Sequence, residues 1–94
     1  MKHDNQLYLG LMSGTSMDGI DAAILSFGDR RCDVVAAACV PYPDSLRHRL
    51  RAVRQDPAIC TIDMLGKLDR DVGECFADGA RDVLSKNRIA AETI

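Results

Sequence analysis

Residues 10–21 read GLMSGTSMDGID and place three glycines beside short hydroxyl and carboxyl side chains. The segment joins two apolar runs, residues 7–12 and 20–27, which predicts that it is the loop of a β-hairpin. A turn of about two residues would reverse the chain, so this longer loop exceeds what folding requires. Gly14 and Gly19 can adopt a positive φ and bring backbone N–H groups close to an anion. We therefore interpret the segment as a phosphate-binding turn.

The polar side chains of this loop suit a phosphate and an accompanying metal ion. Thr15 and Ser16 supply hydroxyl donors. Asp18 and Asp21 repel a phosphate, but either carboxylate can hold a hydrated Mg²⁺ that accompanies it. The alternative interpretation is an ordinary turn rich in Gly, Ser, Thr and Asp.

Other loop motifs fail on spacing. Gly14 and Gly19 match the start of a Walker A loop, but Ile20 and Asp21 stand where that motif needs Lys and Ser or Thr. The pattern G-x-G-x-x-G is absent, and Ser16 does not lie in a G-x-S-x-G nucleophile elbow. The acidic residues also lack the spacing of a calcium loop.

Two resemblances rest on these residues. The run YLGLMSGTSMDGIDAAIL, residues 8–25, resembles the first hairpin of the superfamily of sugar kinases, actin and heat-shock ATPases. Within it, M-S-G-T-S-x-D-G-x-D is similar to the signature of the anhydro-N-acetylmuramic acid kinases. A weaker resemblance continues through VPYP at residues 40–43 and LGKLD at residues 65–69, so it covers essentially the whole chain.

The resemblance implies that this loop grips the β- and γ-phosphates of ATP. The residues then expected to bind the nucleotide are Gly14, Thr15, Ser16, Met17, Asp18, Gly19, Ile20 and Asp21. Sugar kinases in general carry an Asp that binds metal-bound water two residues before the glycine of this turn, where this chain has Met12. The Mg²⁺ role is therefore assigned to Asp18 inside the loop, with Asp21 as the alternative or as a carboxylate at a strand edge.

The resemblance also implies a reaction. The family hydrolyses the 1,6-anhydro bridge of anhydro-N-acetylmuramic acid and phosphorylates the 6-oxygen with Mg·ATP, giving N-acetylmuramic acid 6-phosphate during cell-wall recycling. It further implies a homodimer. The cysteine spacing and the absence of a secretory signal before the first strand predict a cytoplasmic protein. Another kinase or ATPase of the superfamily, or a fragment without turnover, are the alternatives. We assign no general base or other catalytic residue within this sequence.

Length and composition limit what the chain can do alone. At 94 residues it has room for one small domain but not for the two lobes of a superfamily ATPase. We expect residues 1–94 to be the N-terminal portion of the first lobe, without kinase activity in isolation. The net charge of −2 predicts no nucleic-acid partner, and no apolar run approaches the ~18 residues of a membrane span.

Periodicity predicts an α/β fold. Residues 7–12, 20–27 and 32–40 are predicted to form a three-stranded antiparallel meander that ends at two prolines. Asp44 is expected to N-cap an amphipathic helix that stops near Asp56. The resemblance places this arrangement in the N-terminal part of an actin-like, ribonuclease H-like ATPase lobe.

A second helix is predicted from near Thr61 to about Lys86, followed by the lead-in to another strand. Its apolar stripe comprises Ile62, Leu65, Leu68, Val72, Cys75, Phe76, Ala80, Val83 and Leu84. Three glycines weaken this helix by up to about 1 kcal/mol each, and close contact or local bending would explain them.

Two groups of side chains have less specific interpretations. The arginines of the first helix, Arg47, Arg49, Arg51 and Arg54, are interpreted as a solvated face, with an anion or partner site as the alternative. The four cysteines, Cys32, Cys39, Cys60 and Cys75, lack zinc or redox spacing and are expected to be reduced and mostly core-facing.

Overall fold

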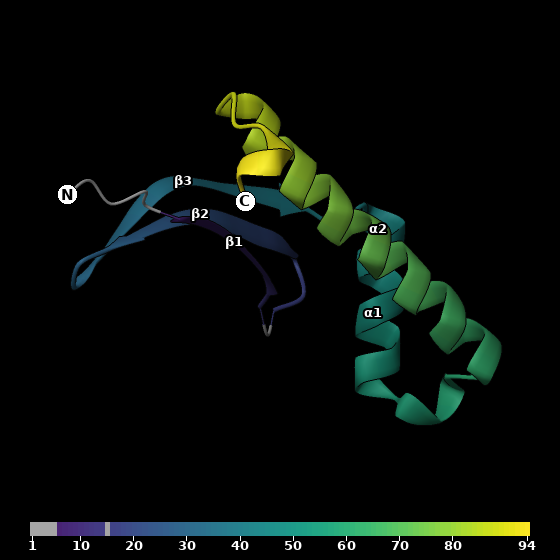
Figure 1. Cartoon of the computed structure of the whole chain (residues 1–94). Coiled ribbons are helices and arrows are strands. Elements are labelled where there is room, and N and C mark those ends of the chain that lie inside the picture. The colour runs from purple at the N-terminus through teal and green to yellow at the C-terminus, as the bar shows by residue number, and fades with distance from the viewer. Residues whose placement is uncertain (1–5, 15) are drawn as a thin grey trace.

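A computed structural model of the chain describes residues 6–14 and 16–94. The elements are β1 (Gln6–Ser13), β2 (Gly19–Gly28), β3 (Arg31–Pro41), α1 (Asp44–Gln55), η1 (Pro57–Ile59), α2 (Ile62–Lys86) and η2 (Ala91–Thr93) (Figure 1). The strands form one antiparallel sheet in the order β1-β2-β3. The predicted α/β fold, a three-stranded meander followed by helices, is therefore confirmed. It is consistent with the N-terminal lobe of an actin-like ATPase.

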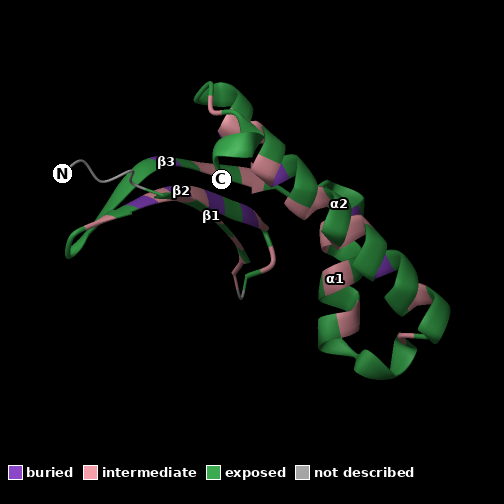
Figure 2. Ribbon diagram, viewed as in Figure 1, coloured by how far each residue is buried: buried purple, intermediate pink, exposed green. Residues whose placement is uncertain are grey.

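In the described part of the chain, the helices cover one face of the sheet and leave the other open. Side chains alternate across a strand, and in the central strand Ile20, Ala22 and Ile24 are buried while the residues between them are more exposed. The C-terminal half of α2 lies across the buried face, where Val83 packs into a cluster with Ala22 and Ile24 (Figure 1). Figure 2 shows the same contrast along β2. The period-2 pattern thus separates a core face from an outer face.

The helices form a second cluster beyond the end of the sheet. Leu46 of α1 and Leu68 of α2 are buried there with Ile20 and Tyr42. The expected apolar stripe of α2 is therefore right in its centre and wrong at its start, because Ile62 is 89% exposed. The first turn of α2 extends past the residues that would bury it. Among the described residues, no helix is long and apolar enough to cross a membrane.

Both helix boundaries agree with the predictions, but one cap does not. Thr61 caps α2, because its Oγ1 accepts a hydrogen bond from the Met64 amide at 3.1 Å. Pro43, not Asp44, occupies the N-cap position of α1, and no side-chain cap is formed there. Asp44 is instead the first helical residue, where its negative charge still complements the helix dipole.

The segment after α2 contains the short 3₁₀ helix η2, and its role as the lead-in to another strand stays a prediction. Another expectation is wrong. The thiols are not mostly core-facing, since Cys32 and Cys39 are exposed and Cys60 and Cys75 are only partly buried. Cys32 and Cys39 pair in register with Phe27 and Asp21, and these partners mark the outer face of the sheet.

The helix glycines have different explanations. A Cβ added at Gly79 would lie 3.2 Å from Cγ2 of Ile20, so Gly79 allows α2 to approach β2 closely. At Gly66 and Gly73 an added Cβ would meet nothing within 4 Å. Close contact therefore accounts for Gly79 and not for the other two.

A Gly→Ala substitution should therefore have opposite effects on stability at Gly73 and at Gly79. Gly73→Ala should raise the free energy of unfolding by about 0.5–1 kcal/mol, because it adds helix propensity at an open position. Gly79→Ala should lower it by about 1 kcal/mol or more, because the methyl group overpacks fully buried Ile20. Urea titrations of both variants measure the effect. Equal stabilisation by both would show that Gly79 is not a contact glycine.

Candidate functional site

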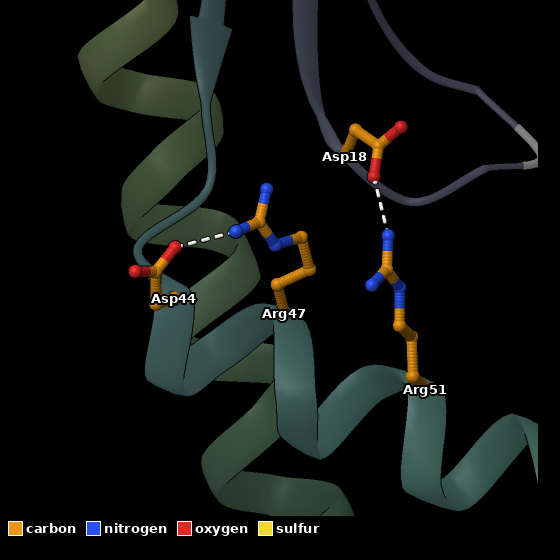
Figure 3. Close-up of polar contacts among 4 residues, drawn as sticks. All are labelled: Asp18, Asp44, Arg47 and Arg51. Carbon is orange, nitrogen blue, oxygen red and sulfur yellow. Dashed lines mark hydrogen bonds and ion pairs between the residues drawn. The ribbon is translucent and has the colours of Figure 1, made fainter.

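The candidate site is the connection between β1 and β2, residues 14–18, at one end of the sheet. Ser13 and Ile20 are the last paired residues before this connection opens. The loop lies beside α1, the helix that follows β3 in the sequence (Figure 3). Thr15, whose hydroxyl was expected to donate a hydrogen bond, lies outside the described residues.

The left-handed residue of the turn is Met17 and not one of the glycines. The Met17 amide donates to the Gly14 carbonyl at 3.1 Å, and Met17 itself has the left-handed φ of 57°. No described glycine has a positive φ, so the expectation for Gly14 and Gly19 is wrong. The loop obtains its left-handed residue at Met17 instead.

Gly19 is required for another reason. A Cβ at this position would lie 2.5 Å from the Val40 carbonyl oxygen and 2.8 Å from Cα of Pro41. Real Cβ atoms do not approach backbone atoms so closely, and backbone cannot move aside as a flexible side chain can. Gly19 therefore lets β2 lie against β3 where the loop ends.

Tyr42 holds both ends of the loop. Its amide donates to the Asp18 carbonyl at 2.9 Å, and its hydroxyl donates to Oγ of Ser13 at 2.9 Å. The residue is only 3% exposed, so these bonds are anchored in the core. Sequence reasoning missed this role and saw only the proline-flanked end of a strand. A tyrosine placed between two prolines directly after a strand was the available signal.

Asp18 is paired with α1. Its Oδ1 accepts from Nη2 of Arg51 at 2.8 Å, across 33 residues of sequence (Figure 3). Both side chains stay about half exposed, at 56% for Asp18 and 51% for Arg51. The carboxylate assigned to the metal is therefore held by an arginine that the sequence placed on a solvated face.

Two other arginines of α1 also form ion pairs, although the sequence had predicted a solvated face. Arg47 pairs with Asp44 in the same helix, and Arg49 bridges to Asp71 of α2 at 2.8 Å. The Arg49 guanidinium also lowers the pKa of Asp71. Much of each exposed arginine still faces solvent, but the charges are organised into specific ion pairs.

The other two residues that the sequence assigned to nucleotide binding, Ile20 and Asp21, lie in β2. Ile20 is fully buried in the core, so its side chain is not available to a ligand. Asp21 lies in the central strand, not at an edge, and pairs in register with Met12 and Cys39. It lines an open hollow of about 600 Å³ on the outer sheet face, whose other walls include Gly10, Met12, Ala23, Ala37 and Cys39.

Asp21 also affects the thiol of Cys39, its neighbour on β3. A hydrogen bond from the Cys39 thiol to Asp21 raises the pKa of Cys39, and desolvation and the negative charge of Asp21 act in the same direction. The thiolate fraction of Cys39 at neutral pH is therefore small. This makes Cys39 a poor nucleophile.

The loop offers groups that fit Mg²⁺ and a polyphosphate. An added Cβ at Gly14 would meet nothing within 4 Å, so the loop surface is open there, and Ser16 is exposed. Hydroxyl and carboxylate oxygens are the ligands that Mg²⁺ prefers. The described residues contain no cluster of three acidic, histidine or cysteine side chains.

Comparison with known proteins agrees with the motif. A family model described as anhydro-N-acetylmuramic acid kinase matches residues 6–94. A relative of that name from Xanthomonas campestris pv. campestris (strain 8004) is 48% identical over 91 residues, covering 94% of this chain and 24% of the relative. Relatives of the same name from Xanthomonas axonopodis pv. citri (strain 306) and Vibrio vulnificus (strain YJ016) are 45% and 38% identical, over 100% and 95% of this chain and 26% and 24% of theirs. The chain thus spans about a quarter of the length of these relatives.

The role of Tyr42 can be tested by removing its hydroxyl. Tyr42→Phe should lower the free energy of unfolding by about 0.5–1.5 kcal/mol, because the partly buried bond to Ser13 is lost while the ring is kept. Tyr8→Phe is the control, since Tyr8 is 51% exposed and contacts Phe27 through its ring. Thermal melting of both variants measures the loss. Equal effects at the two positions would refute a specific role for the Tyr42 hydroxyl.

The effect of Asp21 on Cys39 has a pH signature. A raised thiol pKa leaves less thiolate at a given pH, so alkylation of Cys39 should reach its midpoint at higher pH in the native protein than in Asp21→Asn. At pH 8 the variant should therefore react faster with iodoacetamide at Cys39. Peptide mass mapping gives the rate at each cysteine, with Cys32 as the internal reference. An unchanged Cys39 profile would exclude Asp21 as the cause.

Proposed function

The chain belongs to the anhydro-N-acetylmuramic acid kinase family, and we propose that it forms the phosphate-binding segment in the first lobe of such a kinase. The observation that carries the proposal is the loop that joins β1 to β2, which has open space at Gly14 and is clamped at both ends by buried Tyr42. A rigid scaffold presenting an open, polar loop is the usual construction of a binding site.

The whole enzyme would hydrolyse the 1,6-anhydro bridge of anhydro-N-acetylmuramic acid and phosphorylate the 6-oxygen, using ATP and Mg²⁺. We place this reaction in the cytoplasm, in a homodimer, by analogy with the family. The sugar site and the general base are assigned to no residue of this chain. This segment contributes to phosphoryl transfer and not to activation of the sugar.

Within the segment, each group has a distinct part. Backbone N–H groups around Gly14 and Gly19 and the hydroxyls of Thr15 and Ser16 would bind phosphate oxygens. Bound Mg·ATP supplies the phosphoryl group and a cation that neutralises its charge. Asp18 would orient water on that cation, and Met17 and Ile20 would contribute backbone only. Donors fixed before the reaction stabilise developing charge better than donors that must reorganise.

The metal role of Asp18 is separable from a turn-forming role. Asp18→Asn keeps size and turn propensity but removes the charge. We expect kcat/KM to fall roughly 10²-fold, the loss typical of one preorganised electrostatic group, while the melting temperature changes little. The measurement is steady-state kinetics across a Mg²⁺ titration, in a chimaeric kinase carrying residues 6–94 in place of the matching segment of the Xanthomonas campestris relative.

The chain offers a closely matched control for this substitution. Asp33 has the same side-chain exposure of 56% and also pairs with an arginine, Arg31, but it lies at the far hairpin. Asp33→Asn should leave kcat/KM and the Mg²⁺ dependence unchanged. If Asp18→Asn behaves like Asp33→Asn, Asp18 is a turn residue and the metal assignment passes to Asp21 or to the remaining part of the kinase.

A further inference from the structure

We propose that Arg51 of α1 is a positioning residue for the phosphate-binding loop: its guanidinium holds the Asp18 carboxylate and orders the loop before a nucleotide binds. The proposal deepens the proposed function and rests on it for its catalytic consequence. The ordering of the loop by Arg51 can be tested without an activity assay.

The geometry comes from two elements that meet at one residue. Asp18 is held at its carbonyl by the Tyr42 amide at 2.9 Å and at its carboxylate by Arg51 at 2.8 Å. Tyr42 directly precedes Pro43, the N-cap residue of α1, and Arg51 lies within the helix. The connection from β3 into α1 therefore supports both the backbone and the side chain of Asp18.

The helix that carries Arg51 is itself well anchored. Leu46 is 3% exposed in the cluster that contains Ile20 and Tyr42, and Leu50 and Val53 pack against this cluster. Figure 3 shows Arg51 extending from α1 toward the loop, while Arg47 turns back to Asp44 at the start of the same helix. Arg51 thus transmits the position of a packed helix to an exposed loop.

The loop needs such support for two reasons. Met17 is left-handed at φ 57°, a conformation that a side-chain-bearing residue keeps only when its surroundings impose it. In addition, an unpaired Asp18 carboxylate would repel a polyphosphate at the turn. The Arg51 guanidinium offsets that charge, and the half-exposed pair stays hydrated, so the carboxylate remains open to metal-bound water.

Hydrogen exchange in the 94-residue chain tests the positioning directly. The Met17 amide, bonded to Gly14, and the Tyr42 amide, bonded to Asp18, report on the two halves of the loop. Arg51→Ala should accelerate exchange at both by about two- to five-fold, as loss of an exposed ion pair permits. Arg51→Lys should restore part of the protection because it keeps the charge.

Two comparisons make the test specific. Arg49→Ala removes an ion pair of the same length, 2.8 Å, from the same helix but ties α1 to Asp71 of α2. It should leave exchange at Met17 and Tyr42 unchanged. In an Asp18→Asn background, Arg51→Ala should add nothing, because Arg51 acts through that carboxylate. Unchanged exchange in Arg51→Ala, or equal acceleration in Arg49→Ala, would overturn the proposal.

Kinetics of the chimaeric kinase test this inference separately from the proposed function on which it rests. Arg51→Ala should raise KM for Mg·ATP about two- to five-fold and leave kcat within about two-fold, because disorder of the free loop is a cost of binding. Arg51→Lys should rescue KM in part. Faster exchange together with an unchanged KM would support the positioning role and count against nucleotide binding by this loop.

Discussion

The contact between Ile20 and Gly79 is the constraint on which the arrangement depends. Ile20 is fully buried in the central strand, and α2 can reach it because Gly79 has no side chain. This approach brings the sheet and the helical cluster together at the residue that directly follows Gly19 and the loop. The end of the candidate site is therefore fixed beside a fully buried core residue.

From that point, support for the loop passes through the β3–α1 connection. Tyr42 and Leu46 pack with Ile20, and Tyr42 then bonds to both ends of the loop. Arg51 adds a charged contact from farther along α1. An exposed ion pair contributes little to stability, about 0–1 kcal/mol, so its importance lies in where it holds a side chain. Buried hydrogen bonds and packing carry the stability of this region.

The carboxylates of Asp18 and Asp21 lie in different surroundings. Asp18 lies at the end of the sheet with an arginine beside it, whereas Asp21 faces the outer side of the sheet and raises the pKa of Cys39. Their side chains therefore meet different environments, although only two residues separate them. The alternation of side chains along β2 explains this separation, since Asp21 points away from buried Ile20 and Ala22.

Local patterns in the sequence were enough to determine the three strands, the two helices, the glycine loop and the family. Period-2 and helical spacing are properties of neighbouring residues, so the element order and the start of the second helix near Thr61 followed directly. Only the tertiary structure decided that Arg51 pairs with Asp18, that Tyr42 bonds to Ser13, and that Gly79 is a contact glycine. The two side-chain contacts join residues 33 and 29 positions apart, and the third joins separate elements. Such partners are chosen by how helices pack on the sheet, and a periodic pattern carries no information about that choice.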